Sequence, residues 1–113
     1  MNIGCHLIIE CRGRHAHLNE QALQALLVSA AEAGGASVLQ AHFHPFGAGK
    51  GVTGVVLLAE SHITVHTWPE HDYAAFDVFM CGDCKPLQAA EIITTACQDA
   101  VTSVRSIDRG LPL

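Results

Sequence analysis

The chain has 113 residues, half of them apolar, which is enough for one hydrophobic core, so we expect a single domain spanning residues 1–113. Six Lys and Arg against eleven Asp and Glu give a net charge of -5 without a basic run, which argues against a nucleic-acid partner. No apolar stretch approaches the roughly 18 residues that cross a bilayer, and no secretory pattern opens the chain, so we expect a cytoplasmic protein without a membrane contact.

The first half of the chain predicts a strand, a helix and a second strand. Residues 5–11 are mostly apolar and lie between turn residues, which is typical of a short strand. After Asn19 the apolar residues recur with a helical period, and Gly34 and Gly35 end this pattern, so Asn19 is the expected N-cap. Residues 36–43 alternate as a half-buried strand does, and a loop follows.

The second half predicts three strands, a second helix and a closing strand. Between the strands at 53–59 and 63–68 lie only Glu60, Ser61 and His62, although hairpin loops usually carry Gly, Asn or Asp. The further elements are a strand at 73–80, a helical stripe from Leu87 to Val101 with Asp83 as its cap and Pro86 in its first turn, and a strand at 103–107.

The order of these elements, β-α-β-β-β-β-α-β with two amphipathic helices, predicts an α+β fold. The expected architecture is a two-layer sandwich in which both helices cover one face of a largely antiparallel sheet.

The five cysteines read as reduced thiols, and two of them suggest a redox function. Cys81 and Cys84, in C-G-D-C-K, follow a strand and precede a helix, as in a thioredoxin-type motif. Only 29 residues follow Cys84, however, which is too few for the rest of that fold. A small C-x-x-C redox module is therefore a remote alternative.

Histidines are frequent and raise the question of a metal. His42 with His44 and His62 with His66 share strand faces, and such pairs can bind zinc. A structural zinc site normally has four ligands in two compact pairs, whereas these histidines are scattered along the chain, so no metal is expected. A metal-binding module is the second remote alternative. Three further histidines are expected to be solvated loop residues, namely His15, His17 and His71.

The most specific sequence is A-E-S-H-I-T-V-H-T-W-P-E, followed by Y-A-A-F-D-V-F-M-C-G. On spacing alone, Ser61 is equally well an ordinary turn residue. The sequence nevertheless closely resembles the self-cleaving S-adenosylmethionine decarboxylase proenzymes of the short prokaryotic type. The resemblance is densest from Gly51 to Asp83 and extends more loosely toward the N-terminus.

This resemblance implies that the chain cleaves itself at the Glu60–Ser61 bond. The products are a β chain of residues 1–60 and an α chain of residues 61–113, whose Ser61 becomes a pyruvoyl group that forms a Schiff base with the substrate amine. The alternative electron sink, pyridoxal phosphate, needs an anchoring Lys, and the chain has only two, both in predicted loops.

The resemblance also assigns roles to individual residues. His66 matches the proton acceptor of processing, Cys81 matches the catalytic proton donor, and Thr53 retains a hydroxyl that assists processing. The match implies Phe46 and Glu70 as substrate-contacting positions. By residue type, Trp68, Phe76 and Phe79 are further candidates for stacking and Glu10 for a polar contact, although most aromatic residues on a strand are expected to pack inward.

The implied activity is pyruvoyl-dependent decarboxylation of S-adenosylmethionine, which supplies the aminopropyl donor of spermidine biosynthesis. The resemblance further implies a homodimer with its active sites near the subunit interface. An arginine or ornithine decarboxylase on the same scaffold is the alternative, because such an enzyme could keep every processing residue while its pocket changes.

Overall fold

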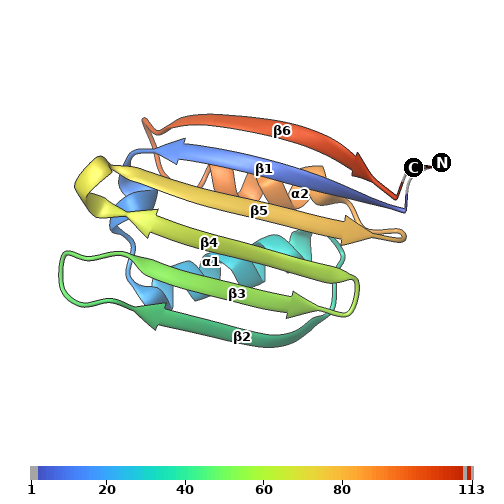
Figure 1. The fold of residues 1–113 in the computed structure, drawn as a ribbon, viewed down its shortest axis with the longest axis horizontal. Helices are drawn as coiled ribbons and strands as arrows, with labels where there is room; N and C mark the ends of the chain where they lie inside the picture. The colour runs from blue at the N-terminus through green and yellow to red at the C-terminus, as the bar shows by residue number, and fades with distance from the viewer. Residues whose placement is uncertain (1–2, 111, 113) are drawn as a thin grey trace.

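The computed structural model of the chain describes residues 3–110 and 112. Six strands form one sheet in the order β2-β3-β4-β5-β1-β6, with every pair antiparallel. In Figure 1 the helices lie behind this sheet. The elements are β1 (Gly4–Arg12), the 3₁₀ helix η1 (Arg14–His17), α1 (Glu20–Ala33), β2 (Val38–Pro45), β3 (Val52–Leu58), β4 (Ser61–Trp68), the 3₁₀ helix η2 (Pro69–His71), β5 (Tyr73–Cys81), α2 (Pro86–Thr94) and β6 (Val101–Arg109). The predicted two-layer α+β sandwich is confirmed.

Helix α1 begins and ends as the sequence predicts. The side chain of Asn19 accepts a hydrogen bond from the backbone N–H of Ala22 at 2.8 Å, which satisfies one donor of the first turn. At the other end, Gly34 donates to the carbonyl of Ala30. Between these caps, Leu23 and Leu27 are fully buried against the sheet.

Helix α2 is shorter than predicted. It ends at Thr94, where the hydroxyl of Thr95 donates to the carbonyl of Glu91 at 2.6 Å. Lys85, and not Asp83, is the N-cap residue, although Pro86 does occupy the first turn. The apolar pattern from Leu87 to Val101 predicted the helix wrongly at both ends. Leu87 is 66% exposed, and Val101 is the first residue of β6.

The prediction that His15 is a solvated loop residue is wrong. Its ring is completely buried, and Nε2 lies 2.7 Å from the backbone carbonyl of Ile93, so the imidazole joins η1 to α2. An N–H on Nε2 satisfies that carbonyl, whereas Nδ1 is buried with no hydrogen-bond partner among the described residues. By contrast, His17 is exposed beside Asp72, and His71 is exposed as expected.

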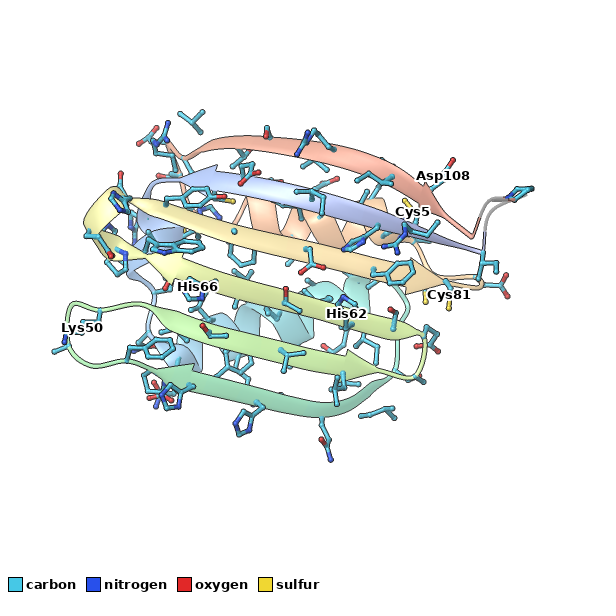
Figure 2. All side chains as sticks on the ribbon, viewed as in Figure 1. Cys5, Lys50, His62, His66, Cys81 and Asp108 are labelled. Carbon is cyan, nitrogen blue, oxygen red and sulfur yellow. The ribbon has the colours of Figure 1, made fainter. Side chains whose placement is uncertain are left out.

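The two faces of the sheet differ in chemistry because alternate residues point to opposite sides. One set, which includes Leu7, Ile9, Ile63 and Val78, packs with the helices in the core. We call the other side, which no helix covers, the open face, and Figure 2 shows its side chains projecting toward the viewer. On the three central strands it carries His6, Ile8, Glu10, His62, Thr64, His66, Trp68, Tyr73, Ala75, Asp77, Phe79 and Cys81.

Within residues 3–110 and 112, neither helix has the length and apolar character that a membrane crossing requires.

Candidate active site

The hairpin between β3 and β4 is strained at Ser61. Leu58 pairs with Ser61, so the loop consists only of Ala59 and Glu60. Two-residue loops that suit the twist of a hairpin need positive φ at one or both central residues, and here neither has it. The misfit falls on Ser61, whose φ of 148° lies in a region used almost only by glycine and costs of order 1–3 kcal/mol.

Backbone and side-chain contacts hold this turn from one side. The N–H of Ala59 donates to the carbonyl of Ser37 at 2.9 Å, and the N–H of Ser37 donates to the Glu60 carboxylate at 3.0 Å. The segment that leads into β2 therefore fixes both loop residues, and the strain at Ser61 has little freedom to relax.

Cys81 contacts the same turn from the other side. Its thiol donates to the backbone carbonyl oxygen of Glu60 at 3.0 Å, from the last residue of β5. This carbonyl belongs to the peptide bond for which the sequence predicts cleavage. The structure thus brings together Glu60, Ser61 and Cys81, three of the predicted site residues.

Two other predicted residues form a pair of their own. Thr53 and His66 face each other across β3 and β4, with Thr53 Oγ1 2.6 Å from His66 Nδ1. His66 follows Ser61 by five residues on one strand, which corresponds to about 16 Å at about 3.3 Å per residue. Figure 2 accordingly shows His66 and Cys81 toward opposite ends of the sheet, so one chain does not bring these two groups together.

Aromatic side chains surround the Thr53–His66 pair. The ring centroid of Trp68 lies 4.1 Å from that of His66, and the centroid of Phe46, which is 51% exposed, lies 6.3 Å from it. Glu70 is exposed on η2, two residues after Trp68 in the sequence. The rings of Phe46 and Trp68 are tilted by 41° and 44° against that of His66, so they form an aromatic cluster at the His66 end of the open face.

Two stacking candidates lie elsewhere. Phe76 is only 2% exposed and packs in the core, as expected for most aromatic residues on strands, so it is not available for stacking. Phe79 does lie on the open face, but its ring stacks on His6 with centroids 5.0 Å apart.

Between the two ends of the open face lies a shallow hollow of about 430 Å³, lined by Ile8, Thr53, Gly54, Val55, Thr64, Val65, His66, Ala75, Phe76 and Asp77.

The second cysteine of the C-x-x-C motif is a poor nucleophile. Partial burial raises the pKa of Cys84, and the nearby Glu60, Cys81 and Asp83 raise it further, so the thiolate is disfavoured. In redox-active motifs of this kind the lowered thiol pKa belongs to the first, attacking cysteine, so the raised pKa of Cys84 does not decide between the alternatives. Cys81 and Cys84 are both free thiols.

A polar network that the sequence did not predict lies beside Ser61. Nε2 of His6 is 2.6 Å and Nε2 of His62 is 3.3 Å from the same oxygen of Asp77, and the hydroxyl of Thr64 donates to the other oxygen. β4 and β5 are consecutive in the chain, but β1 is far from both, so the network depends on how β1 pairs with β5 and in what register. Each imidazole directs a nitrogen at the carboxylate, so these groups form a hydrogen-bonded network whose ligand atoms lie within 4.8 Å of one another.

The fold and these residues define a small α+β protein in which the residue after Glu60, Ser61, has a strained backbone conformation, and comparison with known proteins gives the family. A sequence model of the family described as S-adenosylmethionine decarboxylase matches residues 5–110. The S-adenosylmethionine decarboxylase proenzyme of Thermodesulfovibrio yellowstonii is 39% identical over 96% of this chain and 82% of the relative. That of Prochlorococcus marinus is 42% identical over 97% of this chain and 90% of the relative.

A solved structure agrees with these matches. The crystal structure of the adenosylmethionine decarboxylase from Aquifex aeolicus superposes with a TM-score of 0.80 at 32% identity, covering 99% of this chain and 94% of that one. The chain therefore belongs to the S-adenosylmethionine decarboxylase family.

The Tyr73–Glu10 pair, which spans β5 and β1 on the open face, yields a testable pH dependence. Tyr73 donates its hydroxyl to Glu10, and this hydrogen bond, followed by partial burial and the negative charge of Glu10, raises its pKa from 10.0 to about 12. Because the folded state favours the protonated phenol, the stabilisation is complete below pH 10 and is lost as the pH rises toward 12.

Tyr73 is the only tyrosine, so ultraviolet titration of the native protein reports it alone. We expect its ionisation near pH 12 in the wild type and closer to pH 10 in Glu10→Gln, with no comparable shift in the control Glu70→Gln. Ionisation of the wild-type phenol at pH 10 would contradict the pairing.

Proposed function

We propose that the chain is a self-cleaving proenzyme whose mature form decarboxylates S-adenosylmethionine with a pyruvoyl group made from Ser61, to supply the aminopropyl donor of spermidine biosynthesis. One observation carries the proposal. The thiol of Cys81 lies 3.0 Å from the carbonyl oxygen of Glu60, and the next residue, Ser61, has a φ of 148°. The names of the relatives favour S-adenosylmethionine over arginine or ornithine as the substrate.

In the first step, Ser61 Oγ attacks the carbonyl carbon of Glu60. The oxygen that gains negative charge is the one already contacted by the Cys81 thiol, and a donor placed there stabilises the oxyanion. Collapse of this intermediate breaks the C–N bond and converts the amide into an ester. Cleavage of this C–N bond frees the φ angle of Ser61, so the strain in that dihedral favours the step.

In the second step, a base removes the α-proton of Ser61 and the ester is eliminated. We assign His66 as this base, with the hydroxyl of Thr53 holding its imidazole at 2.6 Å. The elimination releases the carboxylate of Glu60 as the end of the β chain, and the dehydroalanine left at position 61 hydrolyses to the pyruvoyl group and ammonia.

The mature site follows from the same residues. The pyruvoyl group supplies a ketone that accepts the electron pair released when carbon dioxide departs. Cys81, whose thiol contacts the carbonyl oxygen of Glu60 next to position 61, returns a proton to the substrate in this proposal. Phe46 and Trp68 fit the adenine ring, Glu70 offers a carboxylate to a cationic or hydroxylated part of the substrate, and the net charge of -5 does not disfavour a sulfonium.

A homodimer would complete this site. Within one chain, His66 lies about 16 Å along β4 from Ser61, too far to reach its α-proton. A second copy laid on the open face with its strands reversed would bring its Thr53, His66 and aromatic residues over the Ser61 end. The partly apolar open face, which no helix covers, suits such an interface.

The first test is the replacement of the nucleophile. Purified wild-type protein should separate under denaturing conditions into fragments of residues 1–60 and 61–113, whereas Ser61→Ala should remain one chain because alanine offers no hydroxyl. Cys84→Ala, which alters a neighbouring thiol, serves as the matched control and should cleave normally. Cleavage of Ser61→Ala at the same bond would overturn the proposal.

Replacement of His66 should stop processing at the ester. Without a base for the α-proton, His66→Ala should accumulate a full-length chain that hydroxylamine cuts, because hydroxylamine cleaves esters and leaves amides intact. His71→Ala, an exposed histidine outside the site, should mature like the wild type. Normal maturation of His66→Ala would remove it from this role.

Replacement of Cys81 should damage turnover more than that of Cys84. Loss of a positioned acid typically costs about 10²- to 10⁴-fold in rate, so processed Cys81→Ala should decarboxylate S-adenosylmethionine slower by this factor. Misplaced protonation should also convert the cofactor to alanine, which the mass of the α chain reveals during turnover. Equal losses in Cys81→Ala and Cys84→Ala would favour the redox interpretation instead.

A further inference from the structure

His62 contacts the proposed nucleophile and an acidic residue at the same time. Its Nδ1 lies 3.4 Å from Ser61 Oγ, and its Nε2 lies 3.3 Å from Asp77 Oδ2. Neither His62 nor Asp77 has a part in the mechanism derived above. Serine, histidine and aspartate in this order form a catalytic triad, the arrangement by which many enzymes activate a hydroxyl.

The surrounding hydrogen bonds determine which nitrogen of His62 carries the proton. Arg109 can only donate, and its Nη1 lies 3.0 Å from Nδ1 of His6, so His6 must present its Nε2–H to Asp77. Thr64 donates to the other oxygen of Asp77, which therefore acts as an acceptor throughout.

The same carboxylate fixes His62. An ionised Asp77 accepts from Nε2–H of His62, which leaves the lone pair on Nδ1 directed at Ser61. This is the tautomer that can remove a proton from the hydroxyl.

We propose that His62 is the catalytic base that activates Ser61 for the acyl shift, and that Asp77 is the residue that positions it. The inference rests on the proposed self-cleavage. Nδ1 of His62 takes the hydroxyl proton while Oγ forms its bond to the carbonyl carbon of Glu60. As the C–N bond breaks, the imidazolium returns that proton to the departing nitrogen, so the step yields an ester and a free amine with no net proton uptake.

This assignment divides the two proton transfers between two histidines. His62 follows Ser61 directly and reaches its hydroxyl, whereas His66 is about 16 Å away along the same strand. The first transfer therefore occurs within one chain, and the second awaits the Thr53–His66 pair. The two roles predict different blocked species, an intact amide without His62 and an ester without His66.

The position of His62 makes the test practicable. Its side chain is 34% exposed on the open face, so its removal leaves the hydrophobic core intact. His6 is the matched control, because it contacts the same oxygen of Asp77 and the same Phe79 ring but is not hydrogen-bonded to Ser61.

The experiment follows cleavage of newly refolded precursor by denaturing gel and intact mass. We expect His62→Ala to slow cleavage by about 10²-fold or more, to accumulate a chain that resists hydroxylamine, and to be rescued by added imidazole. His6→Ala should cleave within a few-fold of the wild type. If Asp77 acts through His62, the double variant His62→Ala/Asp77→Asn should be no slower than His62→Ala alone.

Two results would overturn the assignment while leaving self-cleavage intact. One is normal cleavage of His62→Ala, and the other is equal slowing in His6→Ala and His62→Ala without rescue by imidazole, which would show a structural role. Thermal unfolding of each variant confirms that it is folded. Failure of the wild type itself to cleave at Ser61 would instead refute the proposed function.

Discussion

The strained backbone at Ser61 is the constraint on which the rest of the site depends. A loop of only Ala59 and Glu60 closes the β3–β4 hairpin without a residue suited to positive φ, and the cost falls on Ser61. Ser37 holds the loop from one side and Cys81 holds the carbonyl of Glu60 from the other. Such strain persists only where its surroundings fix it, and breaking the peptide bond releases it.

The sheet explains why the site has two separate halves. Helices α1 and α2 cover one face, so the polar and aromatic residues of the central strands collect on the other. The antiparallel register then places Ser61 and Cys81 at one end of this open face and the Thr53–His66 pair five residues away. If a second copy covers this face, maturation depends on dimerisation. An isolated chain would then form the ester at Ser61 more readily than it completes the β-elimination.

Local sequence signals predicted most of the fold, because alternation, helical period and caps act over short ranges. Asn19 and Gly34 end α1 as expected, whereas the apolar stripe after Pro86 continued past the true end of α2. The resemblance around Ser61 indicated the residues of the proposed site. The contacts of Cys81 with Glu60 and of His62 with Asp77 were not predictable, because they depend on which strands are neighbours and in what register. His15 was misjudged because its partner, the Ile93 carbonyl, lies 78 residues away.

The most direct test of this account is the intact mass of the fragment that begins at position 61. Formation of the pyruvoyl group by an acyl shift and elimination releases ammonia, so this fragment should be lighter by one ammonia than a chain that begins with serine. Borohydride should reduce the ketone of the pyruvoyl group. The companion fragment should end in an ordinary carboxylate at Glu60. A fragment with an intact Ser61 at its N-terminus would show simple hydrolysis of the bond and would contradict the central claim.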